Sequence, residues 1–154
     1  MMMTAEDVGR LKTGLEREER IYLDLRDLSR RQGEIIEREE GVEALLEVLG
    51  RKQVLISEIE TIEDEVSPIK QAWEETRETH GQRVRREIEE RVTRLQAVLA
   101  ELLELEDKAR TLLQRQQHEL AGEIRKISRS REAHQAYGGG RDKPTSTGLI
   151  DSRC

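Results

Sequence analysis

Three histidines are the residues of this chain best suited to bind a metal, but their spacing does not favour a metal site. They stand at His80, His118 and His134, far from the single cysteine, Cys154. Protein zinc sites are typically built from Cys and His ligands in short, paired spacings. One cysteine can form neither a thiolate cluster nor an intrachain disulfide, which fits a reducing cytoplasm. We therefore predict no metal and no other cofactor.

Acid–base chemistry would have to come from the carboxylates. The chain contains 33 Asp and Glu residues, so many of them fall within one helical turn of another. General acid–base catalysis also needs a pocket that shifts a carboxyl pKa. A long, thin helical protein offers little room for such a pocket, and the sequence does not predict an enzyme.

Two further motifs could contact a phosphate group. The triple glycine Gly138–Gly140 has no preceding strand and no adjoining Gly-Lys-Ser or Gly-Lys-Thr arrangement, so we interpret it as a flexible linker. Arg125, Lys126, Arg129 and Arg131 form a basic cluster near the predicted end of a helix. Positive charge is favourable at that pole of the helix dipole, which explains the cluster without an anionic ligand.

The composition predicts an all-α protein. Only 34% of the residues are hydrophobic and 39% are charged, Phe is absent, and one Trp and two Tyr are the only aromatic residues. Aromatic side chains supply much of the buried area in ordinary cores, so burial here must come from Leu, Ile and Val in thin seams. The net charge of −6 opposes general binding to nucleic acid, which needs a surplus of Lys and Arg.

One long apolar stripe dominates the second half of the chain. Its members are spaced by three, four or multiples of seven residues, which places them on one face of a helix. A stripe of this kind over about 45 residues would be roughly 65 Å long. The residues are Val84, Ile88, Val92, Leu95, Leu99, Leu102, Ala109, Leu113, Leu120, Ile124 and Ile127.

Three helices are expected, over residues 4–38, 42–78 and 82–133. Thr4 is the predicted N-cap of the first helix, and Glu39-Glu40-Gly41 and Thr79-His80-Gly81 are the predicted turns. Pro68 interrupts the second helix, but the apolar spacing continues in phase across it, which favours one kinked helix over a restart.

Three glycines are expected to weaken the first helix. Gly9, Gly14 and Gly33 each cost roughly 1 kcal/mol relative to Ala in a helix interior. We therefore expect this helix to fray or to depend on its neighbours.

Short turns require the three helices to alternate in direction, which predicts an elongated antiparallel three-helix bundle or coiled coil with a long C-terminal helix. Residues 1–135 form one helical domain in this interpretation, and residues 136–154 form a flexible tail. We expect residues 84–109 to pack within the chain. Two interpretations remain for the residues that follow on the stripe: they form either a homodimer seam or a groove for a foreign partner. These residues are Leu113, Leu120, Ile124 and Ile127.

The layout resembles a known family. Three helices, the segment 49–56 (Leu-Gly-Arg-Lys-Gln-Val-Leu-Ile) leading into Ile59 and Ile62, and a tail with Tyr137 before three glycines are similar to the FlgN-type flagellar export chaperones. The resemblance implies a chaperone that binds hook–filament junction proteins through their C-terminal helical segments. It keeps them soluble and unassembled before flagellar type III export, without nucleotide or metal.

The resemblance also implies the location of the partner-binding residues and the cellular compartment. In such chaperones the C-terminal helical part binds the partner, which here selects Leu113, Leu120, Ile124, Ile127 and Tyr137. The flagellar export apparatus is a further possible partner.

The N-terminus lacks the pattern of a secretory signal, and no apolar run approaches a membrane span, so a cytoplasmic location is expected. The alternative is a homodimeric coiled-coil scaffold or adaptor without a client.

Overall fold

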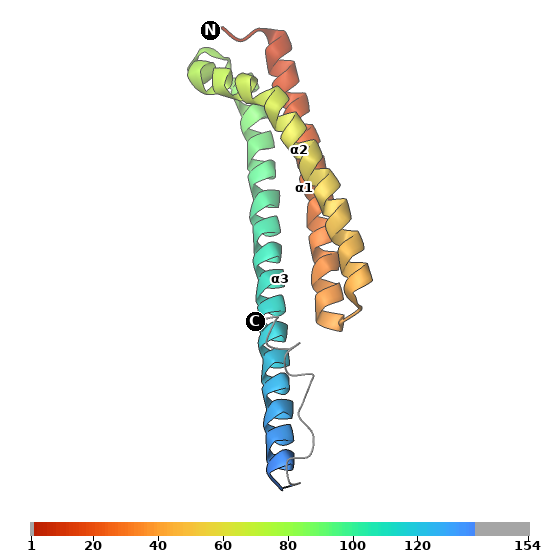
Figure 1. Ribbon diagram of the computed structural model, residues 1–154. Coiled ribbons are helices and arrows are strands. Elements are labelled where there is room, and N and C mark those ends of the chain that lie inside the picture. Colours follow the sequence, from red (N-terminus) through yellow and green to blue (C-terminus); the bar gives the residue numbers. More distant parts are fainter. Residues whose placement is uncertain (1, 138–154) are drawn as a thin grey trace. The chain divides into compact units, whose positions relative to one another are not determined.

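The computed structural model describes residues 2–137, the last two of them by their backbone alone. It contains α1 (Ala5–Arg38), α2 (Val42–Thr76), the short 3-10 helix η1 (Arg77–Thr79) and α3 (Gln82–Tyr137). Figure 1 shows α1 and α2 as neighbouring antiparallel helices. The predicted all-α class with antiparallel helices and a long C-terminal helix is confirmed.

The chain divides into two units, residues 1–113 and 114–154, and the boundary falls inside α3. Helix α3 continues four residues past its expected end at 133. The predicted tail begins at 136, so nearly all of it lies outside the described residues, and its separation from the helical domain stays a prediction.

Helix α1 begins with a capping box. The backbone N–H of Asp7 donates to Thr4 Oγ1 at 3.1 Å, and the backbone N–H of Thr4 donates to Asp7 Oδ2 at 3.1 Å. Two N–H groups that have no partner inside the helix are thereby satisfied. The expectation that Thr4 caps this helix is confirmed.

The turn between α1 and α2 lies where it was predicted, but its left-handed residue is a glutamate. Glu39 has φ 53° and ψ 47°, and its N–H and that of Glu40 donate to the carbonyls of Ile36 and Ile35. These bonds satisfy carbonyls at the helix end. Gly41, the glycine of this predicted turn, has φ 112° and precedes the first residue of α2.

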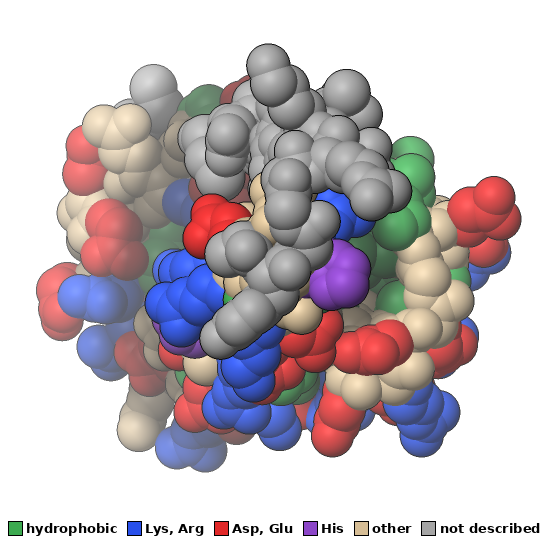
Figure 2. Space-filling model, turned by 60° about the horizontal axis from the view of Figure 1, so that its bottom comes forward, with side chains coloured by type: hydrophobic (Ala, Val, Ile, Leu, Met, Phe, Trp, Pro, Cys, Tyr) green, Lys and Arg blue, Asp and Glu red, His purple; other side chains and the backbone are tan. Residues whose placement is uncertain are grey.

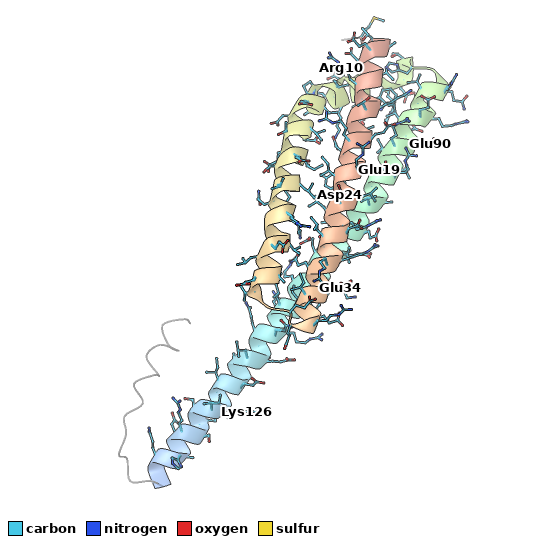
Figure 3. All side chains as sticks on the ribbon, turned by 90° about the vertical axis from the view of Figure 1, so that its right-hand side faces the viewer. Arg10, Glu19, Asp24, Glu34, Glu90 and Lys126 are labelled. Carbon is cyan, nitrogen blue, oxygen red and sulfur yellow. The ribbon has the colours of Figure 1, made fainter. Side chains whose placement is uncertain are left out.

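Helix α3 runs parallel to α1, as an up-down-up arrangement requires. Contacts between the two helices join residues separated by 75 positions: Arg91 pairs with Glu16 at 2.9 Å, and Arg26 with Glu101 at 3.4 Å. Lys12 and Glu87 form a third such pair. Glu19, which Figure 3 labels on α1, pairs with Arg94 at 3.6 Å. Pairs of this kind stabilise a protein little, but they record the register of the helices.

The core of the 1–113 unit is a seam of aliphatic side chains from all three helices, with one tryptophan. The first half of α3 contributes Ile88, Leu95 and Ala109, which are buried, so the expectation that residues 84–109 pack within the chain is confirmed. Val98 is also buried, although it lies off the predicted stripe. The main cluster consists of Val8, Leu11, Leu15, Ile21, Leu25, Ile62, Val66, Trp73, Ile88 and Leu95.

Gly14 is buried where α1 and α2 approach each other closely. A Cβ atom at this position would lie 2.6 Å from Val66 Cγ2, which is closer than two carbon atoms can pack. A Cβ atom at Gly9 or Gly33 would meet no neighbouring atom within 4 Å. The three glycines were expected to act alike, but Gly14 has a packing role that the other two lack.

Helix α2 continues through Pro68, as the in-phase apolar pattern predicted. Figure 1 shows that its last part changes direction, which is consistent with the clash and lost hydrogen bond that a proline introduces. Near its end the ring of Trp73 stacks on that of His80, with 4.9 Å between ring centroids. The side chain of His80 also lies 3.2 Å from Thr76 Oγ1, so this histidine belongs to the packing of the α2–α3 connection.

Candidate partner-binding surface

The second half of α3 consists of residues that favour a helix. Between 114 and 135 it is rich in Gln, Glu and Arg, and Gly122 is its single glycine. At 100° per residue, Leu113, Leu120, Ile124 and Ile127 fall within a sector of about 60°. We call these four residues the distal face.

The distal face exposes more apolar surface than the rest of the stripe. Leu120 and Ile127 are each 57% exposed, and Leu113 and Ile124 are half-buried. The side chain of Tyr137, the fifth predicted site residue, lies outside the described side chains. The structure therefore places four of the five predicted residues together on one helix face.

Basic residues are concentrated in the same part of α3 as the distal face. Arg125, Lys126, Arg129 and Arg131 are all exposed, and Figure 3 labels Lys126 on this part of the helix. On the side of the molecule that Figure 2 presents, acidic and basic side chains are interspersed, with small hydrophobic areas between them. The second half of α3 thus combines an exposed aliphatic face with a surplus of basic side chains.

A second exposed apolar face lies on α2 and was not predicted as a site. Val42 is 70% exposed, Leu46 60%, Leu49 39% and Ile56 37%. We call these four residues the α2 face. Their spacing of four, three and seven residues was visible in the sequence, but it was interpreted only as part of the second helix and, for Leu49 and Ile56, of the segment that carries the family resemblance.

A buried lysine connects the three helices near the end of the 1–113 unit. Lys52 of α2 is 7% exposed, and its Nζ donates to Gln32 Oε1 of α1 at 2.7 Å and to Glu106 of α3. Ser29 donates to the same Glu106 carboxylate at 2.6 Å. Burial acts to raise the pKa of Glu106, but the hydrogen bonds from Lys52 and Ser29 hold it below its usual value.

Another polar layer lies farther along the α1–α2 interface. Glu18 is 2% exposed and pairs with Lys70 at 2.9 Å, and Lys70 also donates to Glu63 at 3.0 Å. Burial raises the pKa of Glu18 despite the nearby ammonium group. Both polar layers are explained by helix packing, and each carboxylate already has a structural partner.

A cavity of about 380 Å³ in the 1–113 unit is bordered by all three helices. Its lining includes six aliphatic side chains and Trp73. Its charged lining residues are Lys70 and Arg77 with Glu74 and Glu89. Within residues 2–137 no cluster of three His, Cys, Asp or Glu side chains could hold a metal ion. None of the helices in this described part of the chain is long and apolar enough to cross a membrane.

The arrangement is that of a helical binding protein, and comparison with known proteins identifies its family. The family model described as FlgN protein matches residues 1–144. The chain belongs to the FlgN family. No curated protein and no solved structure matches it.

Membership of the FlgN family confirms the resemblance and the function predicted from it. FlgN proteins are flagellar export chaperones for hook-associated proteins, and they are not enzymes. A chaperone of this kind binds its substrates in the cytoplasm before their export, which confirms the predicted location. The match includes the second half of α3 and continues past Tyr137.

Proposed function

We propose that this FlgN-family chain binds the C-terminal helical segment of a hook-associated protein on the distal face of α3. The observation that carries the proposal is the exposure of Leu120 and Ile127, each 57%, on a helix whose preceding half uses the same stripe as core. An amphipathic client helix would cover this face by its own apolar residues.

The energetics allow useful affinity. Fully burying an aliphatic side chain contributes roughly 1.5 to 3 kcal/mol, and the distal face offers four such side chains. Ordering the client segment and losing translational freedom oppose binding by several kcal/mol. Apolar residues of the client are buried against the same face and add to this gain, which brings a micromolar dissociation constant, about −8 kcal/mol, within reach.

Tyr137 is included in the proposed site, on the basis of the family resemblance at the tyrosine before Gly138–Gly140. An aromatic side chain at the end of the distal helix would extend the apolar contact with the client. Delivery of the bound client to the flagellar export apparatus completes the proposed role.

The test is co-purification with the hook-associated proteins FlgK and FlgL from the same organism. The double variant Leu120→Asp/Ile124→Asp should lose the client and keep wild-type far-ultraviolet circular dichroism. Tyr137→Ala should weaken binding by a smaller factor. Leu103→Asp is the matched control, because Leu103 is 68% exposed and lies outside the distal face.

Two results would contradict the proposal. Retention of the client by the double variant would move the binding site elsewhere on the chain. Unfolding of the 1–113 unit in the double variant would show that the distal face belongs to the core.

A further inference from the structure

The α2 face is an exposed apolar surface that the proposed client site does not use. With Gln53 it forms a continuous row, Val42, Leu46, Leu49, Gln53 and Ile56, with alternating steps of four and three residues. The row lies about 120° around α2 from the buried side chains Val48, Ile62 and Val66. It is therefore turned away from the core of its own bundle, in the spacing of a coiled-coil seam.

The distal face has the same spacing in the same order. A shift of 71 residues along the chain moves the α2 row onto residues 113, 117, 120, 124 and 127 of α3. This second row contains all four residues of the distal face. Parallel helices that pair in this register form the layers Val42–Leu113, Leu46–Gln117, Leu49–Leu120, Gln53–Ile124 and Ile56–Ile127. Every layer contains an aliphatic residue, and three layers are aliphatic on both sides.

The charges beyond these layers are complementary in the same register. The next position places Glu60 of α2 opposite Arg131 of α3. At 100° per residue, Glu63 and Asp64 of α2 flank this position, whereas Arg125, Lys126 and Arg129 lie on other faces of α3. An antiparallel pairing would separate Glu60 from Arg131, so this pair favours the parallel direction.

The parallel pairing requires two molecules. Helix α3 is one unbroken helix from Gln82 to Tyr137 and runs antiparallel to α2 in the 1–113 unit. A parallel contact between α2 and α3 therefore joins different copies. A twofold axis would form the contact twice, once from each copy, and would close the assembly as a dimer.

We propose that the α2 face binds the distal face of α3 from a second copy of this chain, in a twofold dimer that the client displaces. This rests on the proposed function, because the client and the second copy use the same distal face. The glutamines Gln53 and Gln117 weaken two of the five layers, since polar residues in a coiled-coil seam cost stability. A weak seam suits a resting state that covers the exposed stripe until a client arrives.

The experiment measures molar mass by light scattering after size exclusion, over a hundredfold range of chain concentration. Wild type should change from monomer to dimer. Leu49→Asp on α2 and Leu120→Asp on α3 should each raise the dimer dissociation constant more than tenfold. Val54→Asp is the matched control on α2, because Val54 is 59% exposed but lies outside the α2 face.

Mixing the variants tests the pairing itself. A dimer of one Leu49→Asp chain and one Leu120→Asp chain retains one intact seam, so the mixture should form more dimer than either variant alone. Glu60→Arg and Arg131→Glu should each weaken the dimer, and the two changes combined in one chain should restore it. An α2–α2 dimer would show neither recovery.

Adding a purified client distinguishes this inference from the proposed function. Leu49→Asp should bind the client at least as tightly as wild type, and the wild-type dimer should dissociate into complexes with one chaperone chain. A monomeric wild type at all concentrations, or loss of the client in Leu49→Asp, would overturn the dimer. Client binding that survives in Leu120→Asp/Ile124→Asp would overturn the proposed function instead.

Discussion

The two halves of α3 carry the same apolar pattern and differ in what covers it. In the first half Ile88 is 1% exposed and Leu95 8%, because side chains of α1 and α2 pack on them. In the second half Leu120 and Ile127 are each 57% exposed. An apolar stripe thus identifies a helix face that is suited to burial, but not the molecule that buries it. In the proposed function, one helix serves both as core and as binding surface.

The largest expected effect comes from placing a charge in each half. Ile88→Asp should destabilise the 1–113 unit by at least about 4 kcal/mol, because it buries an unpaired carboxylate. Leu120→Asp should change the free energy of unfolding by less than about 0.5 kcal/mol and remove client binding. Urea unfolding followed by circular dichroism measures the stability of both variants. Similar stability losses in the two variants would erase the distinction between the halves.

The polar layer that holds the end of the first half to α1 and α2 comes next. Lys52→Met should cost about 2 kcal/mol, since it removes a buried partner of Glu106, whose carboxylate still reaches solvent. The double variant Lys52→Met/Glu106→Leu should recover most of this loss, because replacing both members of a buried pair by apolar groups is often neutral. Lys12→Met, in a more exposed pair with Glu87, is the control and should cost under about 1 kcal/mol.

Glycine substitutions should have opposite signs in the two regions. Gly14→Ala should destabilise the 1–113 unit by about 1 kcal/mol, because overpacking against Val66 exceeds the gain in helix propensity. Gly122→Ala, which meets only the end of the Arg125 side chain at 4.0 Å, should stabilise its part of α3 by about 1 kcal/mol. Thermal unfolding reports the first effect, and slower amide hydrogen exchange reports the second. Stabilisation by Gly14→Ala would show that the close approach of α1 and α2 is relaxed in solution.

The smallest expected effect is a pH dependence at Glu106. The pKa of its carboxyl group in the folded chain is below the usual 4.5. Ionised Glu106 therefore contributes fully to the free energy of unfolding above pH 4.5, and this contribution is lost as the pH falls through the pKa of the folded chain. The loss should stay under about 1 kcal/mol, because the carboxylate is partly exposed. The free energies of unfolding of wild type and Glu106→Gln, compared between pH 7 and pH 3, isolate the contribution of the Glu106 carboxylate. Parallel pH profiles would contradict it.

The polar layers could not be predicted from the sequence. Glu18 and Lys70 are 52 positions apart, and Lys52 and Glu106 are 54 apart. No short motif connects such residues, because their proximity follows from the register between helices. The roles of Gly14 and Glu39 were missed for a similar reason: the first depends on Val66 of another helix, and the second on where α1 ends relative to the turn.

The sequence by itself determined the helices, their turns, the antiparallel order and the family. These features follow from local periodicity, capping and connection length, which act over a few residues. Tertiary structure decided which Leu and Ile residues are core and which remain available to a partner. Ile88 and Leu120 lie on one stripe, but burial depends on which helices lie beside each residue. Only the packing of α1 and α2 on the first half of α3 distinguishes them.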